Sequence, residues 1–411
     1  MEEVIATTLG PVGYLRSATA IRERCGEVFN LALKGNSDHF NINLDRLDGV
    51  VQLVKAETLR HYPDLNVPYH SRWRHFNAGE IDRIAALDGL LESVPKIERC
   101  RAKLELAIVS VLLDAGAGDA WGYMDPDSGL RHKRSEGLAL ASIYAFAEGF
   151  FGPESCSVTS ERLRAITSDD LKVAFQVSTD NPLLGIDGRR GLLNKLGEVI
   201  DSRPQDFRGM QGRLGGVLES IQELGDGESV NASELLRFVL TTFADIWPGR
   251  ISIAGQNLGD VWKHSKVGGE GETRGLVPIH KLSQWLTYSL LEPLEYLGIQ
   301  VVGLDQLTGL AEYRNGGLFM DGGVLSLRDS AALSFEHAPS SELIVEWRAL
   351  TIMLLDETAN RLRSLLGKSE RDLPLAKVLQ GGTWSVGRTL ALGRRTGGGP
   401  PLKIASDGTV F

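Results

Sequence analysis

Residues 340–367, SSELIVEWRALTIMLLDETANRLRSLLG, are the stretch that decides the fold of this chain. Leu343, Trp347 and Leu350 recur at intervals of three and four residues, which places them on one face of an α-helix. Ser340, just before the apolar run, is a candidate N-cap. A helix of this length with a continuous apolar face predicts a core element of a mainly α protein.

The same helical spacing recurs along the chain. Helices are expected at 20–35, 44–60, 79–94, 97–118, 135–152 (with Ser135 as a candidate N-cap), 192–200, 232–246 and 277–298. The β-prone pieces at 250–256 and 319–327 indicate a minor antiparallel β element. No internal repeat or low-complexity linker divides the 411 residues. We therefore expect a single compact helical unit over residues 1–411.

Composition narrows the class of protein. The net charge of −9 opposes nucleic-acid binding, which relies on clustered Lys and Arg. Cys25, Cys100 and Cys156 are widely spaced without a CxxC pair, which fits a reducing cytosol and predicts no metal site. No apolar run reaches about 18 residues, so no membrane span is expected, and the acidic start predicts no secretory signal. We expect a cytoplasmic protein without a cofactor; the sequence does not define its oligomeric state.

A dense polar and aromatic cluster, YHSRWRHFNAG, occupies residues 69–79. Such side chains are costly to bury without partners. One interpretation is a pocket wall in which His75 and Phe76 contact a substrate. The alternative is a structural corner held by arginine–backbone bonds, and the pattern leaves both open.

An acidic bend and an arginine pair carry weaker signals. Asp114 lies at a bend of small residues and remains a candidate ligand contact. Arg189 and Arg190 follow the turn in FQVSTDNPLLGIDGRRG (175–191), where a helix start with arginines suits an anion such as a phosphomonoester. A plain turn with solvated arginines is an equal alternative.

Three further segments carry candidate chemistry. Within residues 246–264, Gln256 supplies an amide, Asp260 an acid and Trp262 a large ring, the composition of an active-site wall. Residues 277–285 add an imidazole and an ammonium group, and LTGLAEYRNGG (307–317) sets an acid, a phenol and a guanidinium side by side. The candidates are Gln256, Asp260, Trp262, His280, Lys281, Glu312, Tyr313 and Arg314.

Familiar cofactor and nucleophile motifs are missing. The chain has no Walker loop, dinucleotide-binding fingerprint, GxSxG elbow or HExxH motif. The available carboxylate, imidazole and phenol groups point to hydrolysis or proton transfer without an organic cofactor.

Several long strings combine into a resemblance. LLDAGAGDAWGY, RSEGLALAS, FQVSTDNPLLG, VPIHKLSQWLTYSLLEPL, LTGLAEYRNGG, PLAKVLQGGTW and the terminal SDGTVF together resemble the uracil-catabolism protein family of fungi and bacteria, long catalogued as a domain of unknown function. In that family's pathway a pyrimidine ribonucleotide is opened and urea is released. The resemblance implies cleavage of ribosylurea, with or without a 5′-phosphate, into urea and the sugar.

A second resemblance concerns mechanism. Residues 255–262 (GQNLGDVW) and 307–314 (LTGLAEYR) are similar to two motifs of queuosine 5′-phosphate N-glycosylases, helical enzymes similar in fold to DNA glycosylases. The resemblance implies the same compact helical fold here. Glu312 stands where those enzymes have Asp, and the two motifs lie farther apart in this chain. These departures affect how far the second carboxylate extends from the backbone. Both acids of the two motifs, Asp260 and Glu312, are nevertheless present in this chain.

The resemblance implies roles for the candidates. Breaking a ribosyl C–N bond builds oxocarbenium charge that a carboxylate stabilises. Asp260 is assigned the base and cation-stabilising role, Glu312 orients the ribose hydroxyls or the urea, and Tyr313 lends its phenol; the two acids can exchange roles. Burial is expected to raise the pKa of one acid and leave the other low. A phosphate would contact His75, Lys281 and Arg314, and the other substrate contacts are Phe76, Gln256, Trp262 and His280.

Three rival functions remain. An amidohydrolase acting on a ureido intermediate would normally need a metal cluster or a Cys or Ser nucleophile with its base. A non-catalytic regulatory protein of the pathway would not need acids and aromatic rings in several segments. A nucleic-acid glycosylase rests on fold analogy alone and is opposed by the net charge.

Overall fold

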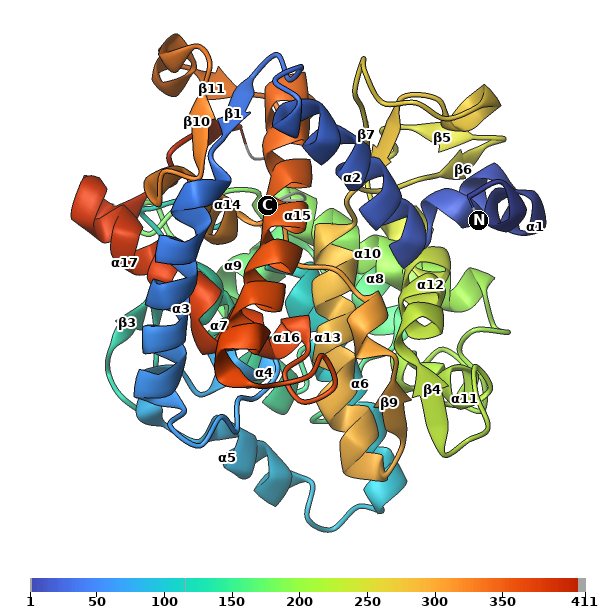
Figure 1. Cartoon of the computed structure of the whole chain (residues 1–411). Helices are drawn as coiled ribbons and strands as arrows, with labels where there is room; N and C mark the ends of the chain where they lie inside the picture. Colours follow the sequence, from blue (N-terminus) through green and yellow to red (C-terminus); the bar gives the residue numbers. More distant parts are fainter. Residues whose placement is uncertain (1, 115, 406–411) are drawn as a thin grey trace. The chain divides into compact units, whose positions relative to one another are not determined.

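The computed structural model describes residues 2–114 and 116–405, with side chains from residue 9 onward (Figure 1). The described chain forms two compact units. Unit 1 contains residues 2–70, 250–284 and 303–405, and unit 2 contains residues 71–249 and 285–302 apart from residue 115. Each unit draws on separate stretches, so no single cut separates them. The expectation of one compact unit stays a prediction.

Unit 1 is built around long helices and short strand pairs. Its helices are α1 (Glu2–Leu15), α2 (Ala18–Leu33), α3 (Leu47–His61), α14 (Tyr313–Asp321), α15 (Glu342–Leu366), α16 (Leu375–Val378) and α17 (Trp384–Arg394). Its strands are β1 (Phe40–Ile42), β5 (Ser252–Ile253), β6 (Gln256–Asn257), β7 (Val261–Lys263), β8 (Leu276–Pro278), β10 (Leu325–Leu327), β11 (Glu336–His337) and β12 (Lys403–Ile404).

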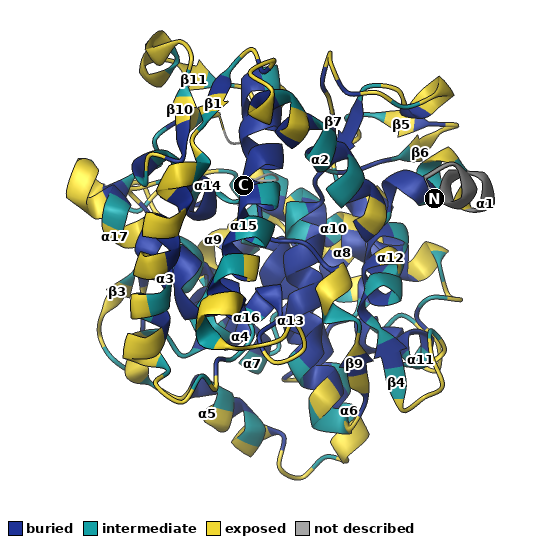
Figure 2. Cartoon of the chain, viewed as in Figure 1, coloured by how far each residue is buried: buried dark blue, intermediate teal, exposed yellow. Residues whose placement is uncertain are grey.

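The helix α15 organises the core of unit 1. It packs against α2, α3 and α14, and its apolar face is buried through most of its length (Figures 1 and 2). Burying each large apolar side chain contributes roughly 1.5–3 kcal/mol, so this face stabilises the unit strongly. The N-cap position is Ser341 and its side chain makes no capping bond, so the predicted cap at Ser340 is wrong.

Unit 2 is also helical. Its helices are α4 (Trp73–Phe76), α5 (Arg83–Leu90), α6 (Lys96–Leu112), α7 (Arg134–Ala147), α8 (Ser160–Ala165), α9 (Ser168–Ala174), α10 (Ile186–Ser202), α11 (Val217–Gln222) and α12 (Ala232–Thr242). Its strands are β2 (Tyr123–Met124), β3 (Arg131–His132), β4 (Ser229–Asn231) and β9 (Gln300–Val302). The core pairs α6 with α7, α4 with α7, and α10 with α8.

The prediction of a mainly α protein with a minor β element is confirmed. Within the described residues, β1–β10, β2–β3, β5–β6 and β7–β8 pair antiparallel. The pairs β4–β9 and β11–β12 are parallel, which the sequence did not predict. The expected similarity to DNA glycosylases stays a prediction.

Two predicted helix starts are wrong by a few residues. The expected helix at 277–298 begins only at Lys281, as α13 (Lys281–Leu297), because the preceding residues pair with β7 as strand β8. The boundary between the units falls inside α13, after residue 284. Ser135 is not an N-cap, because α7 already begins at Arg134. No helix within the described residues has both the length and the apolarity to cross a bilayer.

Candidate functional site

Asp260 of unit 1 lies directly before β7, and donors from three segments hold its carboxylate. Arg348 of α15 donates from Nη1 to Oδ1 at 2.7 Å and from Nη2 to Oδ2 at 2.8 Å. Trp262 Nε1 donates to Oδ1 at 2.5 Å, and the backbone N–H of Lys281 donates to Oδ2 at 2.9 Å. These bonds fix the carboxylate and join it to the first residue of α13.

The pKa of Asp260 lies well below its ordinary value. Burial alone would raise this pKa, but the charge of Arg348 and the hydrogen bonds from Arg348 and Trp262 outweigh burial. The carboxylate therefore stays ionised at neutral pH. Because its oxygens already accept four bonds and Arg348 balances its charge, the geometry suits positioning better than proton abstraction.

His280 follows β8 with a backbone that L-residues rarely adopt. Its φ is +49°, and its backbone N–H donates to the Asp260 carbonyl at 3.2 Å. The side chain is buried, and ring Nε2 donates to the Leu15 carbonyl at 2.8 Å. Burial lowers the pKa of this imidazole, so the ring is neutral at neutral pH. The strained residue holds the entry to α13 in place.

Glu312 is the N-cap residue of α14. Its Oε2 accepts from the backbone N–H of Arg314 at 2.8 Å, and its Oε1 accepts from that of Asn315 at 2.6 Å. The carboxylate thus satisfies two N–H groups that a helix start leaves without partners. The residue is half-buried and each oxygen keeps a further lone pair, so the group can still meet a water or a substrate hydroxyl.

The pKa of Glu312 is raised, in contrast to that of Asp260. Burial raises it, while the N–H bonds from Arg314 and Asn315 and the charge of Lys281 oppose burial without cancelling it. Lys281 therefore acts on both acids, through its N–H on Asp260 and through its ammonium charge on Glu312. The two carboxyl groups have pKa values shifted in opposite directions, as the sequence predicted for such a pair.

The remaining candidates of unit 1 have varied surroundings. Arg314 is buried, its Nη1 donates to the Gly398 carbonyl, and its guanidinium lies 4.9 Å from the centre of the half-buried Tyr313 ring. Gln256 is exposed on β6, and its Oε1 accepts from Arg16 Nη1 at 3.4 Å. The buried Trp262 ring, whose N–H serves Asp260, packs within unit 1.

The predicted contacts His75 and Phe76 belong to unit 2. His75 is half-buried, with Nδ1 2.9 Å from Ser135 Oγ and its ring 5.6 Å from the Trp285 ring. Phe76 is fully buried, with its ring edge-on to Trp73 at 5.4 Å. Phe76 therefore serves the core of unit 2, and its contact with a substrate stays a prediction.

Sequence reasoning did not identify Arg348 or Gln284 as candidates. Arg348 is buried within the apolar face of α15, and a charge in such a run signals a fixed partner elsewhere. Gln284 is buried in the first turn of α13, where its Oε1 accepts from Thr308 Oγ1 at 3.2 Å and its Nε2 has no hydrogen-bond partner. The signal available in the sequence was the polar amide of Gln284 at the start of a helical segment.

Metal ligation has no support from side-chain clustering. In the part of the chain that the structure describes, no three His, Cys, Asp or Glu residues come together in a way that could hold a metal ion. The cysteines Cys25, Cys100 and Cys156 are unpaired and buried. The expected lack of a cofactor stays a prediction.

Comparison with known proteins places the chain among relatives of nearly equal length. Residues 14–411 match the family described as Protein of unknown function (DUF1688). Protein urg3 of Schizosaccharomyces pombe is 40% identical over 97% of this chain and 99% of that protein. Uracil catabolism protein 4 of Lachancea kluyveri is 36% identical over 98% of this chain and 100% of that protein.

Proposed function

Because this chain belongs to the DUF1688 family, and one relative is named for uracil catabolism, we propose that it acts in uracil catabolism. Its reaction is hydrolysis of an N-ribosyl bond. Ribosylurea, with or without a 5′-phosphate, is cleaved to urea and ribose or ribose phosphate. The observation that carries the reaction is the pair of carboxylates with oppositely shifted pKa values, both coupled to Lys281.

Glu312 is the general base and cation-stabilising group in this proposal. Its raised pKa brings proton transfer closer to neutral pH than an ordinary carboxyl group allows, and its open lone pairs can accept a proton from water. The same carboxylate lies near the developing positive charge of the ribosyl group and stabilises it. This exchanges the roles first assigned to the two acids.

Asp260 is a positioning residue in the same scheme. Both of its oxygens are engaged by bonds from Arg348 and Trp262, and its bond to the Lys281 N–H sets the start of α13. The charge of Lys281 then acts on Glu312 and opposes the rise that burial causes in the pKa of this acid. Tyr313, next to Glu312, supplies a phenol that can hydrogen-bond the departing urea.

The test measures urea release by the purified full chain from ribosylurea and from its 5′-phosphate. Release from either one supports the hydrolase and identifies the form of the substrate. The variant Glu312→Gln should lower kcat by roughly 10²–10⁴-fold, because it removes the base. Urea release by Glu312→Gln at the wild-type rate would contradict the assignment.

A matched control separates catalysis from helix capping. Asp82 caps α5 by accepting from the Ala85 N–H at 3.0 Å, so Asp82→Asn changes a capping carboxylate at another helix. Both variants should lose a similar, small amount of thermal stability. Only Glu312→Gln should lose turnover. Since a base must be deprotonated, wild-type kcat/KM should also rise with pH through the raised pKa of Glu312.

A further inference from the structure

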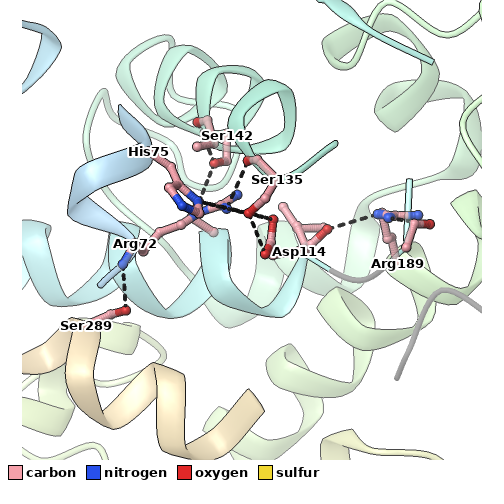
Figure 3. A network of polar contacts seen from close by, with 11 residues as sticks. Arg72, His75, Asp114, Ser135, Ser142, Arg189 and Ser289 are labelled. Atoms are coloured by element: carbon pink, nitrogen blue, oxygen red, sulfur yellow. Dashed lines mark hydrogen bonds and ion pairs between the residues drawn. The ribbon is translucent and has the colours of Figure 1, made fainter. Parts of the chain in front are cut away.

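A second polar cluster lies in unit 2, formed by the start of α7, the end of α6 and the segment around α4 (Figure 3). Asp114 follows α6, and both of its oxygens lie within hydrogen-bond reach of Ser135 Oγ, at 2.7 and 2.8 Å. Ser135 Oγ is also 2.9 Å from His75 Nδ1. We call these residues, with Arg72 and Trp285, the Arg72 cluster.

Arg72 is the centre of the cluster and is 0% exposed. Its Nε donates to Ser110 Oγ at 2.6 Å, and its Nη1 donates to Asp114 Oδ1 at 2.7 Å and to the Ser135 carbonyl at 3.1 Å. Its Nη2 has no hydrogen-bond partner. Leaving charged N–H groups buried without acceptors is costly, so this nitrogen points to an acceptor that the protein does not supply.

Trp285 provides a second donor of the same kind. The side chain is 4% exposed, and its Nε1 has no hydrogen-bond partner. The Arg72 guanidinium lies 5.5 Å from the centre of the Trp285 ring, and the His75 ring lies 5.6 Å from it. Buried tryptophans elsewhere in unit 2 differ: Trp121 Nε1 donates to the Phe175 carbonyl at 3.0 Å.

The charge around Asp114 is unbalanced. Arg189 is also fully buried, donates from Nε to the Leu113 carbonyl at 3.0 Å, and is attracted by Asp114. Asp114 thus faces two guanidinium groups, those of Arg72 and Arg189. The start of the 14-residue helix α7, beside Ser135, adds positive partial charge. A ligand with one or more negative charges would offset this excess.

We propose that the Arg72 cluster binds the oxyanion of a small acid, a carboxylate or a phosphate monoester, through Arg72 Nη2 and Trp285 Nε1. His75 and Ser135, both half-buried, flank the ligand at the more open side of the cluster. The arrangement differs from a hydrolytic triad, because Asp114 contacts the serine oxygen, whereas the acid of a triad holds the imidazole. The proposal does not depend on the hydrolysis of ribosylurea.

Calorimetric titration of the full chain tests the proposal, with inorganic phosphate, ribose 5-phosphate and acetate as probes. Wild-type protein should bind at least one of them, and comparing phosphates with acetate identifies the acidic group. Trp285→Phe keeps an aromatic ring but removes the N–H, and should weaken binding roughly tenfold or more. Trp121→Phe removes an N–H that already has a protein acceptor, and should leave the affinity unchanged while lowering thermal stability.

Thermal unfolding of the wild-type chain provides a second test of anion binding that requires no variant. At constant ionic strength, the bound anion should raise Tm as its concentration increases, whereas chloride should not. Absence of binding by all three probes would overturn the proposal, as would equal affinities of wild type and Trp285→Phe. Retained anion binding together with no urea release would refute only the proposed hydrolysis.

Discussion

At the residue scale, the Asp260–Arg348 pair links two segments that are 88 residues apart in the sequence. The Asp260 side chain is 18% exposed and that of Arg348 is 2% exposed, so the pair is largely shielded from water. Removing one member of such a pair leaves the other buried without its partner, which is usually worse than removing both. The Asp260–Arg348 pair therefore fixes the position of the start of α13.

A double-mutant cycle tests the energetic coupling between Asp260 and Arg348. Arg348→Met should lower the free energy of unfolding by roughly 3 kcal/mol, because it leaves Asp260 ionised and unpaired. Asp260→Asn combined with Arg348→Met should cost less than the sum of the two single changes. Urea-induced unfolding of the four proteins measures the coupling. Strictly additive losses would show that the pair does not act as a unit.

The same pair sets a pH dependence. The pKa of Asp260 is lower in the folded state than in the unfolded chain, so its contribution to stability is complete above the unfolded value of about 3.9. That contribution is lost as the pH falls below this value. The stability difference between wild type and Asp260→Asn should therefore shrink between pH 7 and pH values near the acid limit of folding.

Sequence reasoning selected the two acids as candidates but did not identify their partners. Glu312 and Asp260 stood out because each interrupts an apolar pattern, and that signal is local. Arg348 as the partner of Asp260, and Asp114 as the partner of Arg72, are contacts that only the tertiary fold creates. A single sequence gives no register for such contacts, so the donor set of each carboxylate was out of reach.

At the element scale, α14 and α17 approach each other closely at one glycine. A Cβ atom on Gly387 of α17 would lie 2.3 Å from the Arg314 carbonyl oxygen of α14. This backbone atom cannot move away without shifting α14, whose N-cap residue is Glu312. The position of the capping carboxylate therefore depends on a residue without a side chain in another helix.

Gly387→Ala should destabilise the chain by roughly 1–3 kcal/mol through overpacking and should also slow urea release. Its control is Gly393→Ala in the same helix, where the position is exposed and nothing lies within 4 Å of the new Cβ. This change should be neutral or stabilise by up to about 1 kcal/mol, because alanine favours the helix. Chemical unfolding and the urea assay together check both; equal effects of the two changes would contradict the close-packing argument.

Element prediction succeeded where periodicity was strong and failed at boundaries. The pattern of 340–367 predicts α15 well because one face of the helix is continuously apolar. The start of α13 was misplaced because the apolar residues 277–279 suit a helix and a strand equally, and pairing of β8 with β7 decides between them. The parallel pair β4–β9 joins residues that are 71 positions apart in the sequence and has no local signature.

At the scale of the whole molecule, unit 2 is completed by a segment that follows residues of unit 1 in the chain. Residues 285–302 supply Ser289, whose carbonyl accepts from Trp73 Nε1 at 2.8 Å, and strand β9, which pairs with β4. A fragment of residues 71–249 lacks both. It should therefore show no cooperative thermal unfolding transition and weak near-ultraviolet circular dichroism, with the full chain as the control; a sharp transition would show that this stretch folds by itself.

The buried cysteines can report how often each unit of this molecule opens. Cys25 lies in unit 1, while Cys100 and Cys156 lie in unit 2, and all three are buried. Burial raises the pKa of each thiol, that of Cys100 to about 12, so almost no reactive thiolate exists in the native chain at neutral pH. A buried thiol is alkylated only after a fluctuation exposes it to the reagent. The alkylation rate of each cysteine therefore reports the opening of the unit in which it lies.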